Sequence, residues 1–312
     1  MAPLARQQAQ ASALLTAVVL QLVAASPLFD MATTQCLLNV SNAVYYNKAT
    51  ATPMLKALGL PRTFHAISNV SQDTHAFVIP VPSANTVILS FRGTDLSISD
   101  LEHDLWFLRG PFGSMLGYEN TTVPDSWYVS RGFVNAYLSV RPGVLEALAA
   151  AALQLEATSA DDDRPSKPPT LLVSGHSLGA AMAVIAAMDA LLDRQISGIF
   201  GDVRFTGFAS PRVGNADFAA AWTERFTGKA FQFMNYYDLI PHEPPRDTGY
   251  EHVLHMGVLG PDAGNFSDTT EPDFDQHLSI DPVFYHHVTT YMAHLGSLPG
   301  ACAWSAVSCA HV

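Results

Sequence analysis

Residues 170–192 read TLLVSGHSLGAAMAVIAAMDALL: a short apolar run, one serine between two glycines, and a long run of small and apolar residues. A nucleophile elbow needs a strand, a strained turn that exposes a serine hydroxyl, and a helix that leaves close beside the strand. Gly175 and Gly179 remove the side chains that would collide where the helix crosses the strand. G-x-S-x-G alone also occurs in inert tight turns, so the flanking strand and helix patterns distinguish a catalytic serine from such a turn. On these patterns we predict that Ser177 is a nucleophile.

The start of the helix predicted after Ser177 serves the same chemistry. Backbone N–H groups in a first helical turn have no intrahelical acceptor and form a partially positive end. The N–H group of Leu178 therefore points to where a tetrahedral oxyanion would form. We predict that Leu178 is one donor of an oxyanion hole.

The elements around the elbow predict an α/β fold. From Thr170 onward, apolar strands alternate with helices, which is typical of right-handed crossovers and a mostly parallel sheet covered on both faces. The predicted strands are 170–175, 202–210 and 230–238, and the predicted helices are 178–194 and 215–226. Upstream we predict helices over 33–47, 95–107 and 141–157, and two strands within 75–93 around a Pro-Ser-Ala-Asn turn. No phosphate loop and no G-x-G-x-x-G pattern occurs.

The N-terminal 26 residues carry one charge, Arg6, an apolar run and small residues at their end, which is typical of a secretory signal peptide. An uncleaved anchor or a buried helix is the alternative. We predict a signal peptide over 1–26 and a single domain over 27–312. Without Arg6 the chain has 15 basic against 28 acidic residues, a net charge of −13. Nucleic acid and strongly anionic membranes are therefore poor partners.

Sequons and cysteines agree with a secretory route. Four N-x-S/T sequons are candidate glycan acceptors, at Asn39, Asn69, Asn120 and Asn265. The three cysteines are Cys36, Cys302 and Cys309, so one disulfide can form in an oxidising compartment. A long bridge from Cys36 to either C-terminal cysteine is our prediction, and a local Cys302–Cys309 bridge is the alternative.

Several motifs resemble the class 3 lipases, a group of fungal lipases with plant and algal relatives on the α/β-hydrolase fold. The matching segments are VSGHSLGAAMA (173–183), VILSFRGTDLSISDLEHDL (87–105), RGFVNAY (131–137), FTGFASPRVGNADFA (205–219) and NYYDLIPHEPP (235–245). They run in the family's order over most of the chain. Two departures are Arg131, where the family usually has histidine, and Ala209, where glycine is usual.

The remaining triad members must follow the serine in the order acid, then histidine. Asp238 closes the predicted strand 230–238, at the edge where open α/β sheets place their sites, and it matches the family's Asp-x-[VI]-Pro. The competing carboxylates, Asp202 and Asp217, are interpreted as residues near helix starts. For the base, the FYHHVTTYMAHL segment resembles the family's late histidine segment. A plant-like H-x-x-x-x-Y spacing favours His286 and leaves His287 as the alternative.

The resemblance also implies a second oxyanion donor, a lid and a substrate class. Thr94, after Arg-Gly, would be the donor, and residues 95–105 would form an amphipathic lid; a helix cap and an ordinary surface helix are the alternatives. We expect a secreted triacylglycerol lipase acting on lipid esters at an oil–water interface, with no cofactor, no metal and no stable membrane insertion. Phospholipase A1, feruloyl-type esterase and a non-catalytic lipid-binding homologue are the alternatives.

Overall fold

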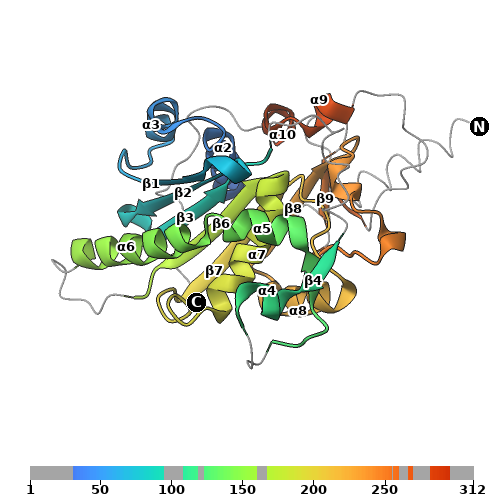
Figure 1. Cartoon of the computed structure of the whole chain (residues 1–312). Helices are drawn as coiled ribbons and strands as arrows, with labels where there is room; N and C mark the ends of the chain where they lie inside the picture. The colour runs from blue at the N-terminus through green and yellow to red at the C-terminus, as the bar shows by residue number, and fades with distance from the viewer. Residues whose placement is uncertain are drawn as a thin grey trace, which may run out of the picture.

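An eight-stranded mixed sheet forms the centre of the protein in the computed structural model (Figure 1). The structure describes residues 31–94, 108–118, 123–159, 167–254, 256–259, 266–269 and 282–295. The strand order is β1-β2-β3-β6-β7-β8-β9-β10. The five strands from β3 to β9 in this order pair in parallel, while β1, β2 and β10 add antiparallel edges. The predicted α/β class with a mostly parallel central sheet is confirmed.

The strands are short, and a separate two-stranded sheet pairs β4 with β5. Their bounds are β1 His65–Asn69, β2 Thr74–Val81, β3 Thr86–Phe91, β4 Arg109–Pro111, β5 Tyr128–Ser130, β6 Thr170–His176, β7 Asp202–Phe208, β8 Ala230–Asn235, β9 Met256–Leu259 and β10 Phe266–Thr269. Short 3-10 turns cover Val70–Gln72, Pro82–Ala84, Ile240–His242 and Arg246–Thr248.

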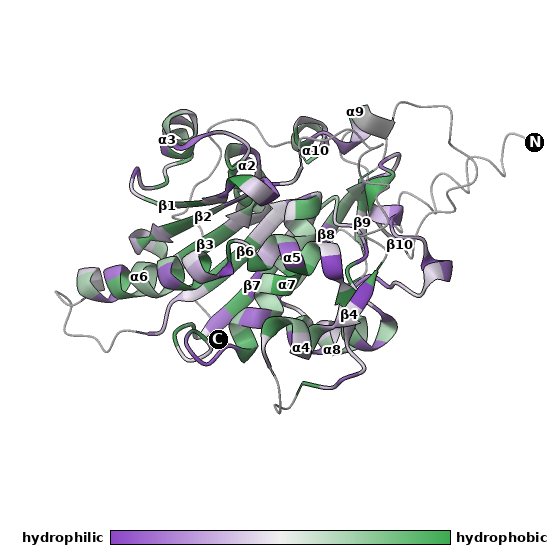
Figure 2. Ribbon diagram, in the orientation of Figure 1, coloured by the Kyte–Doolittle hydropathy of each residue, from purple (hydrophilic) through white to green (hydrophobic). Residues whose placement is uncertain are grey.

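Helices cover both faces of the sheet. Their bounds are α2 Met31–Ala43, α3 Lys48–Ala57, α4 Phe112–Leu116, α5 Arg131–Leu138, α6 Arg141–Ser159, α7 Leu178–Leu192, α8 Ala216–Phe226, α9 Pro282–His286 and α10 Val288–His294. Helices α6 and α7 contact one face, and α2 and α10 contact the other. Figure 2 shows the hydrophobic colour along α7, whose side chains from Gly179 to Ala190 are all buried.

Alternate residues of the central strands enter two separate cores, which is the side-chain periodicity of a strand covered on both sides. In β3, Leu89 belongs to the core beneath α6 and α7, whereas Ile88 belongs to the core beneath α2. In β6, Val173 and Leu172 divide in the same way. This register brings the ends of β6 and β8 to the same edge, where Ser177 and Asp238 follow.

Some sequence predictions lie outside the described residues: the signal peptide 1–26, the lid 95–105, and Cys302 and Cys309. The long disulfide therefore stays a prediction, with Cys36 buried in α2. The sequon at Asn39 lies on the packed side of α2, where this side chain is 8% exposed and its Nδ2 donates to the Gln35 carbonyl at 2.8 Å. A glycan at Asn39 is incompatible with that packing. Two further sequons, at Asn120 and Asn265, lie outside the described residues.

Candidate active site

Ser177 occupies a strained turn between β6 and α7. Its backbone has φ 60° and ψ −132°, a conformation that non-glycine residues rarely adopt. Close approach of α7 to the sheet explains both flanking glycines. A Cβ on Gly175 would lie 2.3 Å from the Gly179 carbonyl group, and a Cβ on Gly179 would lie 2.3 Å from the Phe91 oxygen. The predicted strand, strained turn and helix are therefore present.

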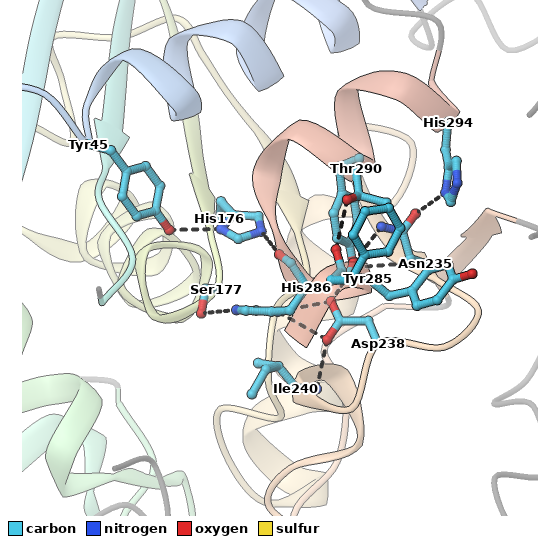
Figure 3. A network of polar contacts seen from close by, with 12 residues as sticks. Tyr45, His176, Ser177, Asn235, Asp238, Ile240, Tyr285, His286, Thr290 and His294 are labelled. Carbon is cyan, nitrogen blue, oxygen red and sulfur yellow. Dashed lines mark hydrogen bonds and ion pairs between the residues drawn. The ribbon is translucent and has the colours of Figure 1, made fainter. Parts of the chain in front are cut away.

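A continuous hydrogen-bonded chain connects Ser177, His286 and Asp238 (Figure 3). Ser177 Oγ lies 2.8 Å from His286 Nε2, and His286 Nδ1 lies 3.0 Å from both carboxylate oxygens of Asp238. A carboxylate only accepts hydrogen bonds, so Nδ1–H donates to it and Nε2 is left to accept from the serine hydroxyl. This is the arrangement in which an imidazole can remove a proton from a serine.

Asp238 is completely buried and accepts two further hydrogen bonds. Tyr291 donates its hydroxyl to Oδ2 at 2.6 Å, and the backbone N–H of Ile240 donates to Oδ1 at 2.9 Å. The position of Asp238 corrects one detail, because β8 ends at Asn235 and Asp238 lies in the turn beyond it. The N–H of Asp238 donates to the Asn235 carbonyl at 3.0 Å, which closes this turn.

The competing carboxylates lie elsewhere. Asp217 is in the first turn of α8, as expected for a residue that favours a helix start. Asp202 is not near a helix start, which corrects our interpretation: it is the first residue of β7 and forms ion pairs with Arg204 at 2.7 Å and Lys229 at 2.9 Å. Burial acts to raise the pKa of Asp202, but the hydrogen bonds from Arg204 and Lys229 lower it overall.

The structure brings His286, and not His287, to Ser177. His286 is the last residue of α9, whereas exposed His287 is the N-cap of α10. Tyr291 lies five residues after His286, and both side chains are hydrogen-bonded to Asp238. The H-x-x-x-x-Y spacing therefore places the histidine and the tyrosine on the same carboxylate. His252 lies away from the triad: it is half-buried, its Nε2 lies 2.7 Å from the Pro241 carbonyl, and desolvation together with nearby Arg212 lowers its pKa to about 3.

Two candidate oxyanion donors border the elbow. Ala180 and Ala181 both donate to the Ser177 carbonyl, so the N–H of Leu178 precedes the first intrahelical bond. Thr94 follows Gly93, and a Cβ on Gly93 would lie 2.9 Å from Ser177 Cβ. The turn after β3 therefore lies directly against the elbow. Thr94 is also the last described residue before the segment predicted to form the lid.

Two residues near the triad were missed by the sequence analysis. His176 precedes Ser177, and its ring centroid lies 4.9 Å from that of His286. Tyr45, at the end of the segment predicted as a helix over 33–47, lies with its hydroxyl 2.8 Å from His176 Nδ1. The x positions of G-x-S-x-G accept any residue, so the motif did not indicate a role for His176. Nothing in the local sequence assigns Tyr45 to the site.

The departures from the family pattern have local explanations. Ala209 has φ 54°, a conformation that glycine adopts more readily. Arg131 begins α5, where its Nε donates to the Arg109 carbonyl at 3.2 Å.

Within the described residues, no group of three or more His, Cys, Asp or Glu side chains could hold a metal ion. In the same part of the chain no single helix could cross a membrane by length and apolarity, although the bent pair Arg131–Leu138 and Arg141–Thr158 meets both criteria together.

The α/β fold and the serine, histidine and aspartate at its sheet edge define a serine carboxylic ester hydrolase. The profile described as "Lipase (class 3)" matches residues 88–248. A secreted mono- and diacylglycerol lipase of Malassezia restricta is 31% identical over 229 residues, covering 69% of this chain and 68% of that protein. The chain belongs to the class 3 lipase family.

Other relatives agree with this assignment. A secreted mono- and diacylglycerol lipase of Penicillium cyclopium is 28% identical over 231 residues, covering 73% of this chain and 66% of that protein. The crystal structure of a mono- and diacylglycerol lipase from Aspergillus oryzae shares the fold with a TM-score of 0.61 at 20% identity. That similarity covers 89% of this chain and all of the other.

Proposed function

We propose that this protein is a secreted acylglycerol lipase with Ser177 as its nucleophile. The observation that carries the proposal is the hydrogen-bonded chain from the strained serine through His286 to buried Asp238. Secretion is supported by the signal-like N-terminus and by relatives that are named as secreted lipases.

In the proposed reaction, Ser177 Oγ attacks the ester carbonyl while His286 Nε2 takes the serine proton. Asp238 holds the imidazole in the Nδ1–H tautomer and stabilises the imidazolium that forms. The N–H groups of Leu178 and Thr94 donate to the oxyanion of the tetrahedral intermediate. His286 then gives its proton to the leaving alcohol, and an acyl ester of Ser177 remains. A water molecule activated by His286 hydrolyses this ester and restores the serine.

The substrate class follows from the family and its relatives. The relatives above carry the name mono- and diacylglycerol lipase, and the family is one of lipases. We propose neutral acylglycerols, including triacylglycerol, as the substrates, met at an oil–water interface beneath a lid formed by residues 95–105. The acidic residues within that segment disfavour anionic headgroups, which supports uncharged lipids over anionic phospholipids.

A panel of purified proteins and lipids tests the proposal. Wild type should hydrolyse emulsions of monoacyl-, diacyl- and triacylglycerol, and Ser177→Ala should lower turnover by about a millionfold, as triad removal does in other serine hydrolases. Hydrolysis of phosphatidylcholine alone would instead indicate a phospholipase A1, and hydrolysis of feruloyl esters alone a feruloyl-type esterase. A wild type that does not react with a fluorophosphonate probe would contradict the serine mechanism and indicate a lipid-binding homologue.

A further inference from the structure

The short helix α9, which carries the proposed base, is held by side chains at its last three carbonyl groups. The final carbonyls of a helix have no intrahelical donor and need other partners. Here each partner comes from a different element. The three bonds join Thr290 Oγ1 to the Phe284 carbonyl at 2.7 Å, Asn235 Nδ2 to the Tyr285 carbonyl at 2.7 Å, and His176 Nε2 to the His286 carbonyl at 2.8 Å.

The third of these bonds differs from the others because its donor belongs to the nucleophile elbow. His176 is covalently joined to Ser177, and its side chain reaches the backbone of the same residue whose side chain reaches Ser177 Oγ (Figure 3). Three residues, His176, Ser177 and His286, and two hydrogen bonds, each 2.8 Å long, therefore form a closed ring. A displacement of α9 that lengthens the distance between Ser177 and His286 must also strain the bond from His176.

The His286 carbonyl determines which nitrogen of His176 carries the proton, and the Tyr45 hydroxyl satisfies the other nitrogen. The His286 carbonyl can only accept a hydrogen bond, so Nε2 of His176 must donate. In a neutral ring Nδ1 then has a free lone pair, and it accepts from the Tyr45 hydroxyl at 2.8 Å. Burial, together with the neighbouring His286, holds the pKa of His176 well below its usual range, which agrees with a neutral ring.

A neutral His176 suits the charge that develops beside it. His286 becomes a cation when it takes the serine proton, and the two imidazole rings lie 4.9 Å apart at an interplanar angle of 36°. A second cation at this distance in a buried site would oppose that proton transfer. Tyr45 also touches the turn that carries the proposed oxyanion donor, because a Cβ on Gly93 would lie 2.2 Å from the Tyr45 hydroxyl.

We propose that His176 is a positioning residue for the catalytic base: its Nε2–H donates to the His286 carbonyl while its Nδ1 is held by the Tyr45 hydroxyl, and it thereby fixes the backbone of His286 relative to Ser177. This inference rests on the proposed function, since it assigns His286 as the base. His176 does not contact the reacting ester in this role. It acts by keeping the distance between Ser177 and His286 at hydrogen-bond length.

Steady-state kinetics on a soluble short-chain ester separate positioning from binding. His176→Phe keeps an aromatic ring but removes the donor, and we expect it to lower kcat by about 30-fold with KM changed less than about twofold, because small misplacements of a catalytic group are costly. His176→Gln restores an N–H donor, and its kcat should be about fivefold higher than that of His176→Phe. Tyr45→Phe removes only the hydroxyl, and we expect kcat to fall by about fivefold.

A matched control and two readouts make the test decisive. Tyr137→Phe also removes a tyrosine hydroxyl from a buried acceptor, Asp189, outside the triad, and it should leave kcat unchanged. NMR of the histidine side-chain nitrogens should show the Nε2–H tautomer at His176, and an Nδ1–H tautomer would overturn the inference. If His176→Phe does not fold, the kcat of Tyr45→Phe and the NMR tautomer of His176 test the positioning role. An active Ser177→Ala variant would refute the proposed function itself. If Ser177→Ala is inactive but Tyr45→Phe and His176→Phe both keep the wild-type kcat, only the positioning role of His176 is refuted.

Discussion

A single buried carboxylate illustrates how the site is maintained at the scale of residues. Asp238 has no exposed surface, and an isolated buried charge is unfavourable unless hydrogen bonds satisfy it. Besides His286, Asp238 accepts from the Tyr291 hydroxyl and the Ile240 N–H. Burial and the adjacent carboxylate raise the pKa of Tyr291 well above its usual value, so its hydroxyl stays protonated as a donor. The tyrosine therefore restricts the orientation of the Asp238 side chain.

Replacing Tyr291 by phenylalanine should impair catalysis more than folding. The change removes a 2.6 Å hydrogen bond to Asp238 Oδ2 and the acceptor of the Asn235 N–H. We expect kcat to fall by about tenfold with KM unchanged, and the free energy of unfolding to fall by about 1–2 kcal/mol. Ester kinetics and urea denaturation measure the two effects.

Tyr250→Phe provides the comparison for that variant. Tyr250 is equally buried and its hydroxyl is hydrogen-bonded to Ser130 outside the triad, so its loss should lower stability by a similar amount without lowering kcat. Equal loss of kcat in both variants would mean that Tyr291 acts only through stability.

The residues of the site differ in how far the sequence could predict them. Ser177 and Asp238 lie in local patterns, a strand followed by a turn, which a sequence displays. The spacing to Tyr291 favoured His286, and the structure places this histidine beside Ser177. The contact between Tyr45 and His176 joins positions 131 residues apart, and no local pattern determines which distant side chains meet.

At the scale of elements, the contact between α7 and the sheet determines where the nucleophile lies. Gly179 lies against the end of β3, with Phe91 O only 2.3 Å from the site of a Cβ. Gly179→Ala forces the helix away from a backbone atom that cannot move independently, so we expect a loss of more than about 3 kcal/mol of stability and little soluble protein. Thermal unfolding and soluble yield are the measurements.

Gly198→Ala is the matched substitution, because nothing lies within 4 Å of a Cβ at that glycine. It should change stability by less than about 0.5 kcal/mol. Wild-type stability of Gly179→Ala would show that α7 can shift without cost, which would contradict the close-approach explanation of the elbow glycine.

A buried ionic cluster binds the C-terminal turn of α7 to its neighbours. Asp189 of α7 is completely buried and accepts hydrogen bonds from Tyr118, from Tyr137 at 2.6 Å, and from the Arg141 Nε at 2.8 Å. Burial and the Asp189 carboxylate raise the pKa of Tyr137 well above its usual value, so that hydroxyl remains a donor. Arg141 is the only arginine among these partners, and its guanidinium also reaches Asp193 at 2.6 Å.

Arg141→Met should destabilise the fold strongly, because it leaves the Asp189 carboxylate buried without a cation. Removing one partner of a buried pair typically costs about 3–5 kcal/mol, and we expect the lower part of this range because the Arg141 side chain is 18% exposed. Urea denaturation measures the change. Arg204→Met breaks the more exposed pair with Asp202 and should cost less than about 1 kcal/mol; equal losses in the two variants would contradict the role of burial.

The elements also show where prediction from sequence reached its limit. Strand β6 and helix α7 are buried along almost their whole length, and α8 has one regular apolar face, so these elements were predicted. The edge strand β1 alternates between exposed and half-buried residues, and β4 and β5 are only three residues long, so neither has a strong pattern. Asp238 was assigned to the preceding strand because the apolar run continues through Tyr236 and Tyr237 after the ladder has ended.

At the scale of the whole molecule, histidines whose pKa is lowered in the folded state make stability depend on pH. His252 is half-buried, its Nε2 lies 2.7 Å from the Pro241 carbonyl, and desolvation with the nearby Arg212 lowers its pKa to about 3. The pKa of His176 is lowered in the same direction by burial and His286. A histidine in an unfolded chain has a pKa of about 6.5. Between these values the unfolded chain binds protons that the folded chain excludes.

Stability should therefore be fully present above about pH 6.5 and should be lost as the pH falls toward about 3, since unfolding is favoured wherever the unfolded state binds more protons. Each such histidine contributes a slope of up to about 1.4 kcal/mol per pH unit. His252→Gln keeps an N–H donor for the Pro241 carbonyl but cannot titrate, so the free energy of unfolding measured in urea across about pH 4–7 should vary less steeply than in wild type. An unchanged slope in this variant would mean that His252 is protonated equally in both states and is not a source of acid sensitivity.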